Sequence, residues 1–222
     1  PKYGIQVYRW VTPLGYDWFN GTCYSDLMNK EAMQCFIEES YNSYYKRYKE
    51  LYGSDIVYEF TDEPCTLFRG RIPEGAIPFT SDLFEIFQKM HGYDAREHLH
   101  NLFLNEKGAE RFRIDYFRTV NNLFENNFSK QIGDWCTNHN IGLTGHYMLE
   151  GSLYGQQTWG TKVMPNYRHQ HAPGIDHLGR QTDELITAKQ CQSVVNQYGK
   201  SRMLSELYGC SGYGMSLSLI HI

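Results

Sequence analysis

Short apolar runs with strand-like periodicity alternate with longer segments of helical periodicity along this 222-residue chain. The strand-like runs are rich in β-branched and aromatic residues and are bounded by turn residues. They lie at 5–11, 56–63, 141–148, 174–178 and 202–209. The helical segments repeat apolar residues at i, i+3 and i+4. They lie at about 30–52, 81–91, 109–139 and 183–198.

Single residues at the ends of these segments support the helix predictions. Asn29 stands before the first helical segment, where its side chain can accept a hydrogen bond from the first turn. Gly92 and Gly199 follow two other segments, and glycine commonly takes the left-handed conformation that ends a helix. We therefore expect helix boundaries near these three positions.

The order of the elements predicts an α/β fold with a parallel sheet. Strands separated by helices need crossover connections, and such connections are right-handed and place successive strands parallel. A doubly wound open sheet would carry a phosphate-binding glycine fingerprint at a strand-to-helix turn, and the sequence contains none. We therefore expect a partial (β/α)8 TIM barrel, with about strands three to seven present.

Composition and charge narrow the classes of function. The chain is 41% hydrophobic and 15% aromatic, which is enough to bury a substantial core. Its net charge of -4 comes without basic blocks, so we expect no nucleic-acid partner, and no apolar run is long enough to predict a membrane span. The six cysteines form neither a C-x-x-C pair nor a zinc-ligand spacing, which predicts free and mostly buried thiols.

Two glutamates stand at the ends of predicted strands. Glu63 is followed by Pro64, which cannot continue a central strand, and Glu206 comes shortly before Gly209. A lone glutamate in such a place is more often a surface ion-pair partner than a catalytic group. A pair at the carboxyl ends of barrel strands favours glycoside hydrolysis, which needs one carboxyl as acid and one as nucleophile or base.

Five further residues are candidates for binding a substrate. Glu150 lies just past a strand and competes with Glu206 as the second catalytic carboxylate, or it bonds a sugar hydroxyl. His146 and Asp176 stand at strand ends and could position sugar hydroxyls, although a structural role is somewhat commoner for such residues. Tyr154 and Trp159 lie in the polar stretch after Glu150 and could stack on a sugar ring.

Metal-ligand residue types gather in one stretch of the sequence, which contains His169, His171, Asp176 and His177. Their spacing matches no zinc-enzyme motif, and histidines in loops are usually solvated. We therefore expect no metal site and no cofactor. Calcium binding by carboxylate and carbonyl oxygens is the one alternative that the sequence leaves open.

Six short motifs occur in a fixed order, and they are Ser25–Asn29, Phe60–Pro64, Gly92–Asp94, Gly145–Met148, Pro173–Asp176 and Ser205–Gly209. Together they resemble bacterial glycosyl hydrolases related to the α-L-rhamnosidases of glycoside hydrolase family 106. The resemblance spans nearly all of residues 1–216. It implies a glycoside or oligosaccharide substrate, with Glu63 as acid or acid/base after strand four and Glu206 as nucleophile or base after strand seven. The sequence around Glu63 departs from the rhamnosidase pattern, which leaves a β-galactosidase-like specificity open.

The domain assignment follows from these motifs. We expect residues 1–216 to form a catalytic barrel fragment and residues 217–222, which match the translation of a sequencing adapter, to be an artefact. A non-catalytic carbohydrate-binding barrel is the alternative function, and it would keep the aromatic cleft without a matched carboxylate pair. An acyl-transfer hydrolase is disfavoured because the chain has no G-x-S-x-G motif.

Overall fold

The computed structural model describes residues 7–11, 15, 17–67, 75–158, 161–179 and 184–218. Within these residues four strands form one sheet in the order β1-β2-β3-β4, and every neighbouring pair is parallel. The strands are β1 Tyr58–Thr61, β2 Gly142–Gly145, β3 Ala172–His177 and β4 Leu204–Leu207. The predicted parallel α/β arrangement is therefore confirmed, and each strand lies beside its predecessor in the sequence.

The described part of the first strand-like run does not form a strand. Residues 7–11 have no regular secondary structure, whereas residues 5 and 6 lie outside the described part of the chain. The alternating side chains of this run pack separately: the ring of Trp10 contacts Phe79 edge to face at 5.2 Å, and Tyr8 stacks on Phe103 at 6.1 Å. The prediction of a strand was wrong for these residues, because the alternation reflects two separate aromatic contacts.

The first helical segment is continuous, although its geometry changes along its length. It comprises α1 Lys30–Phe36, the π-helical turn η2 Ile37–Tyr41, α2 Asn42–Tyr48 and the 3-10 turn η3 Lys49–Leu51. The Asn29 side chain accepts a hydrogen bond from the Ala32 N–H at 2.8 Å, as the sequence predicts for an N-cap.

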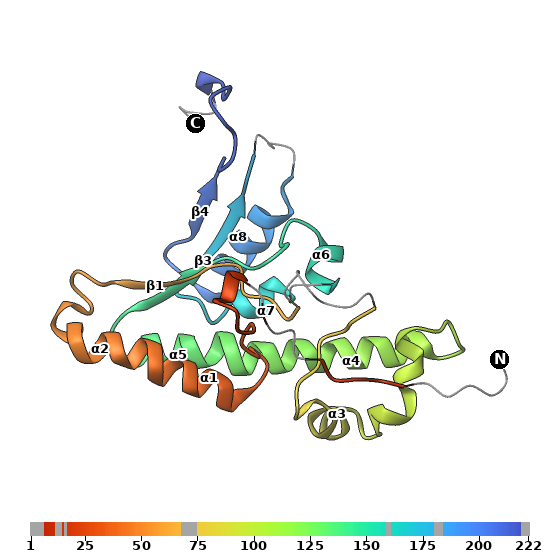
Figure 1. Cartoon of the computed structure of the whole chain (residues 1–222). Helices are drawn as coiled ribbons and strands as arrows, with labels where there is room; N and C mark the ends of the chain where they lie inside the picture. Colours follow the sequence, from red (N-terminus) through yellow and green to blue (C-terminus); the bar gives the residue numbers. More distant parts are fainter. Residues whose placement is uncertain are drawn as a thin grey trace.

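Two further predicted helices also form. The helix α3 Leu83–His91 ends at Gly92 in the left-handed conformation, and the 3-10 segment η4 Ala95–Leu102 follows it. The long predicted helix consists of α4 Ala109–Phe124, the π-helical turn η5 Glu125–Lys130 and α5 Gln131–Asn138. Figure 1 shows α1 and α2 lying along α5 below the sheet, where Tyr41 contacts Trp135 at 5.0 Å.

The segment between β2 and β3 contains two short helices where the sequence indicated only a polar loop. These are α6 Leu153–Thr158 and α7 Val163–Tyr167. The last long helix is α8 Ile186–Tyr198, which ends at Gly199 in the left-handed conformation as predicted. A 3-10 turn, η1 Asp17–Phe19, lies near the start of the chain.

The hydrophobic core lies between the sheet and the helices and extends between α3 and α4. Its fully buried side chains come from both layers and include Met33, Leu83, Phe87, Phe124, Ile132, Leu143 and Val163. Burial of each large apolar side chain contributes about 1.5–3 kcal/mol of transfer free energy. All six cysteines are free, as predicted, but only Cys65, Cys136 and Cys191 are buried. The expectation of mostly buried thiols holds for half of them.

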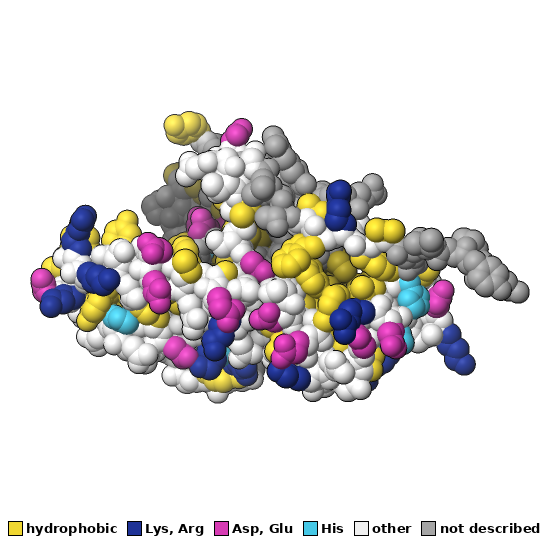
Figure 2. Space-filling model, turned by 60° about the horizontal axis from the view of Figure 1, so that its bottom comes forward, with side chains coloured by type: hydrophobic (Ala, Val, Ile, Leu, Met, Phe, Trp, Pro, Cys, Tyr) yellow, Lys and Arg dark blue, Asp and Glu magenta, His cyan; other side chains and the backbone are white. Residues whose placement is uncertain are grey.

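The surface carries charges of both signs. Figure 2 shows acidic and basic side chains interspersed over the helical face of the molecule, without a broad region of one sign. Among the described residues, no helix has both the length and the apolar character that a membrane crossing requires.

Candidate active site

Backbone strain gathers where three of the strands give way to loops. Glu63 follows β1, Leu149 follows β2 and Tyr208 follows β4, and these non-glycine residues have φ angles of 45°, 55° and 61°. Holding a residue with a Cβ in this region costs on the order of 1–3 kcal/mol. Strain of this kind is typical of functional sites, and here it marks the carboxyl ends of the parallel strands.

His146 lies at the centre of this end of the sheet. It directly follows β2 and its side chain is 1% exposed. Its Nε2 atom lies 3.1 Å from Oε2 of Glu206 and 3.7 Å from Oδ1 of Asp62. The ring of Phe60 packs edge to face against the imidazole at 5.5 Å. The histidine therefore brings together side chains from β1, β2 and β4.

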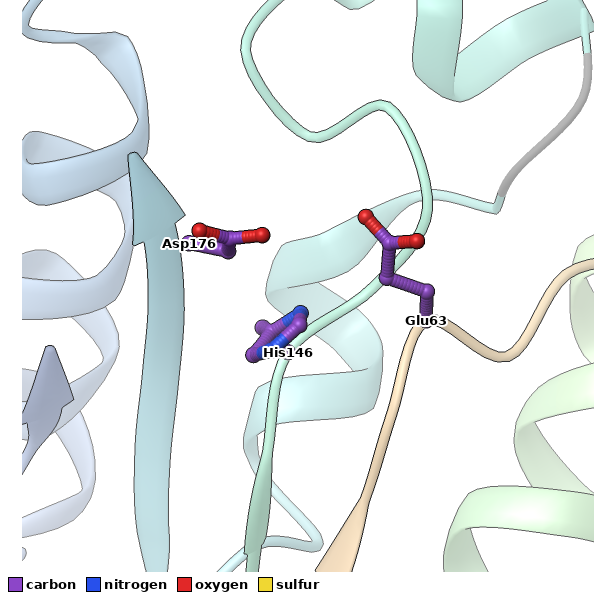
Figure 3. A group of neighbouring side chains, drawn as sticks. All are labelled: Glu63, His146 and Asp176. Atoms are coloured by element: carbon purple, nitrogen blue, oxygen red, sulfur yellow. The ribbon is translucent and has the colours of Figure 1, made fainter. Parts of the chain in front are cut away.

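Two more carboxylates face the same imidazole. One side-chain atom each from Glu63, His146 and Asp176 lie within 4.8 Å of one another, and Figure 3 shows both carboxyl groups on the same side of the ring. Asp176 is also the register partner of Glu206 across β3 and β4, so their side chains emerge on the same face of the sheet. With Asp62, four carboxyl groups from three strand ends surround one histidine.

This crowding changes the acidity of the carboxyl groups. Burial raises the pKa of Glu63, and the negative charges of Asp62, Asp176 and Glu206 raise it further, whereas His146 lowers it. The pKa of Asp176 is raised for the same reasons, with burial as the largest cause. A carboxyl group in such surroundings keeps its proton to higher pH than a free one, as a general acid must.

Glu150 is not one of the three residues of this group, and it contacts the group through the backbone of Asp176. Glu150 is 3% exposed, and both oxygens of its carboxylate accept hydrogen bonds. Oε2 accepts a hydrogen bond from the Tyr167 hydroxyl at 2.6 Å, and Oε1 accepts one from the backbone N–H of Asp176 at 2.5 Å. Burial raises the pKa of Glu150 to about 7. Its contact with a substrate stays a prediction.

The other residues that the sequence analysis considered lie elsewhere in the described structure or outside it. Tyr154 lies on α6 and is 79% exposed, and Trp159 lies outside the described part of the chain. His169 bonds Glu125 at 3.0 Å, and His171 contacts the Leu143 N–H and Thr137. These two histidines therefore make hydrogen bonds with residues other than Asp176.

A divalent cation would find suitable donor atoms at the cluster itself. Among the described residues, the only group of three metal-ligand side chains is Glu63, His146 and Asp176. Nδ1 of His146 and Oδ1 of Asp176 are buried and make no hydrogen bond within the described structure. Two carboxylates and one imidazole suit zinc, manganese or iron better than calcium, which prefers six to eight oxygens. The expected absence of a metal stays a prediction.

A hollow lies at the opposite end of the sheet from this cluster, near the amino ends of β3 and β4. It has a volume of about 210 Å³ and is lined by Gly133, Asp134, Thr137, Arg168, His169, Gln170, His171 and Lys200. Its cations are engaged within the protein, because Arg168 pairs with Glu125 and the Lys200 ammonium donates to the Arg168 carbonyl at 2.9 Å. The convergent carboxylates make the other end of the sheet the better candidate site.

The sequence analysis missed three residues that form or support the site, namely Asp62, Phe60 and Tyr167. Asp62 directly precedes Glu63, and its place in the strand-end motif was the signal that could have identified it. Phe60 and Glu59 are neighbours on β1 and point to opposite faces of the sheet. The sequence does not say which face carries His146, so the contact of Phe60 with His146 could not be inferred. Tyr167 carried no local signal, because its contact with Glu150 depends on the placement of α7.

Comparison with known proteins supports the fold. No family model and no curated protein matches the chain. A solved structure of a rhamnosidase from Novosphingobium sp. PP1Y is similar, with a TM-score of 0.66 and 21% sequence identity. The match covers 83% of this chain and 17% of that rhamnosidase chain, so this chain spans about a sixth of its length. At this identity the likeness shows the fold: a rhamnosidase-like α/β arrangement, consistent with part of an α/β barrel.

Proposed function

We propose that this chain carries the catalytic centre of a glycoside hydrolase built on a partial (β/α)8 barrel. The observation that carries the proposal is the convergence of Glu63 and Glu206 on His146 at the carboxyl ends of parallel strands. Glycoside hydrolysis needs two carboxyl groups that flank one bond, and barrel enzymes present their catalytic groups at this end. The likeness to a rhamnosidase supports an α-L-rhamnoside as the first substrate to test.

The sheet itself favours a barrel. The strands occur in sequence order and are all parallel, as they are in a (β/α)8 barrel. Phe60 on β1 and Leu207 on β4 are both substantially exposed on the two edge strands of the described sheet. In a closed barrel further strands would pair with these edges and cover such residues.

Glu63 fits the role of general acid. Its raised pKa keeps a proton available, and this proton would pass to the glycosidic oxygen as the bond from that oxygen to the anomeric carbon breaks. The strained backbone at Glu63 fixes the start of its side chain at the strand end. Pro64 follows directly and stiffens the same turn.

Glu206 fits the complementary role of nucleophile or base. A carboxylate only accepts hydrogen bonds, and Nε2 of His146, 3.1 Å from Oε2 of Glu206, can donate one in the tautomer that carries its proton on Nε2. In this role the Glu206 carboxylate would attack the anomeric carbon or remove a proton from an attacking water. The separation of the reacting oxygens in the substrate complex would decide between retention and inversion of configuration.

A panel of 4-nitrophenyl glycosides tests the proposal. We expect release of 4-nitrophenol from the α-L-rhamnopyranoside, with the β-D-galactopyranoside as the alternative that the Asp62-Glu63-Pro64 sequence leaves open. Calorimetric binding of a sugar without hydrolysis of any glycoside would instead identify a carbohydrate-binding protein. Neither hydrolysis nor binding across the panel would contradict the proposal.

A further inference from the structure

Strand β3 extends beyond the strand beside it. The register between β2 and β3 ends at Gly145 and Pro173, whereas β3 continues to His177. On its other side, β3 remains paired with β4 from Gly174 to His177. Among the described residues, the end of β3 that carries Asp176 therefore has a neighbouring strand on one side only, and a backbone N–H on the other side needs another acceptor.

The Glu150 side chain supplies that acceptor. Its Oε1 atom accepts the Asp176 N–H at 2.5 Å, and a hydrogen bond to a carboxylate is stronger than one between neutral groups. The left-handed conformation of Leu149 turns the chain just before Glu150, whose side chain is buried. Glu150 thus takes the place of a β2 backbone carbonyl at this point of the sheet.

Glu150 is itself held from two helices, and a third helix contacts one of the residues that hold it. The hydroxyl of Tyr167, on α7, donates to its second carboxylate oxygen at 2.6 Å. The amide of Gln156, on α6, donates both to the Glu150 carbonyl and to Oε1 of Gln190, on α8, at 2.9 Å each. Tyr167 and Gln156 are both buried, so Glu150 is held from within the protein at the end of β3.

We infer that Glu150 is a positioning residue, which sets the place of the Asp176 carboxylate beside His146 and Glu63 by binding the Asp176 backbone. The inference deepens the proposed function and rests on it for its catalytic consequence. Asp176 is also the register partner of Glu206, so a shift of the β3 end would disturb both acidic groups. A displacement of about 1 Å in a catalytic group can lower turnover about 100-fold.

Three variants separate this role from general stability. Glu150→Ala removes the acceptor, Glu150→Gln keeps an oxygen that can accept the Asp176 N–H, and Glu85→Gln changes an exposed glutamate on α3 as a control. The first measurement is amide hydrogen exchange of Asp176 by NMR on the labelled protein, because it does not depend on activity. The second is kcat and KM for 4-nitrophenyl α-L-rhamnopyranoside.

In Glu150→Ala we expect the Asp176 amide to exchange at least about tenfold faster, while buried amides of α4 keep their rates. We expect kcat to fall about 100-fold with a smaller change in KM, and Glu150→Gln to recover most of the loss. The Glu85→Gln control should match the wild-type protein in both measurements. A role in bulk packing alone would not confine the change in exchange to the Asp176 amide. That localised change in Glu150→Ala, together with recovery of kcat in Glu150→Gln, therefore distinguishes positioning from packing.

Unchanged exchange of Asp176 in Glu150→Ala would overturn the inference. If the alanine variant does not fold, Glu150→Gln decides: its neutral oxygen should weaken the bond and move the Asp176 amide proton upfield, and an unmoved signal would overturn the inference. Faster exchange in a protein whose wild type hydrolyses no glycoside would support the positioning contact and contradict the proposed function instead. The two failures are therefore distinguishable.

Discussion

Nε2 of His146 lies 3.1 Å from Oε2 of Glu206, although β3 separates the strands from which the two side chains come. Neighbouring strands lie about 4.7–4.9 Å apart, so the backbones of β2 and β4, which are two strand spacings apart, are separated by about 10 Å in total. The side chains meet in front of β3 and enclose Asp176 on the same face of the sheet. This contact draws three strand ends into one acidic site, and the following predictions test what that site does.

Glu63→Gln should lower activity according to the leaving group. Hydrolysis of a glycoside with an alkyl leaving group should fall by about 10²- to 10⁴-fold, because an alkoxide needs a proton as it departs. 4-Nitrophenolate leaves without full protonation, so the loss on its glycosides should be much smaller. Steady-state rates on the two substrate types give the ratio, and equal losses would contradict the acid role of Glu63.

The pH profile of activity should respond to Asp62. A general acid works in its protonated form, so the rate falls as the pH rises through its pKa, and a raised pKa places this alkaline limb at higher pH. Asp62 contributes to the raised pKa of Glu63. Asp62→Asn should therefore move the alkaline limb of kcat/KM to lower pH. An alkaline limb that stays in place in this variant would argue against Glu63 as the titrating group.

Gly145 is expected to tolerate no side chain. A Cβ atom at this position would lie 2.0 Å from the Thr61 carbonyl oxygen, and its φ of 131° is strained for any other residue. Gly145→Ala should destabilise the protein by about 2–4 kcal/mol in denaturant unfolding. Gly151 provides the matched control, since a Cβ atom there meets nothing within 4 Å. Equal stability of the two alanine variants would show that β1 and β2 are not this close.

His171 should make stability depend on pH. Burial, and then the charge of Lys200, lowers its pKa, and its Nδ1 accepts the Leu143 N–H at 2.9 Å. The unfolded chain therefore takes up a proton first as the pH falls, so stability is full above about pH 6.5 and declines below it. His171→Asn keeps an acceptor in the same place but does not titrate. Between pH 7 and 5, chemical unfolding should show a smaller loss for the variant, and parallel losses would contradict this role.

Features of the fold that depend on neighbouring residues were predictable from the sequence, whereas features that depend on contacts between distant segments were not. The cap at Asn29 and the helix ends at Gly92 and Gly199 depend on a few neighbouring residues, so the sequence predicts them. The strand predicted at 5–11 fails over residues 7–11, because alternation alone does not provide a neighbouring strand. The parallel order followed from the alternation of strands and helices.

The sequence predicted some members of the candidate site, but not all of them and not their arrangement. Glu63 and Glu206 were placed at strand ends from Pro64 and Gly209, and they lie there in the structure. The burial of Glu150 follows from a left-handed residue at Leu149, which is not a type that predicts such a turn. Its contact with the Asp176 backbone depends on where β2 stops beside β3, and no local pattern specifies that point.

The most direct test of the account is the rate at which the wild-type protein and Glu206→Gln hydrolyse 4-nitrophenyl α-L-rhamnopyranoside, with Glu85→Gln as the exposed control. We expect measurable turnover by the wild type and the control, and a loss of at least about 10³-fold in Glu206→Gln at an unchanged melting temperature. Turnover that survives this substitution would contradict the assignment of the carboxylates around His146 as the catalytic centre.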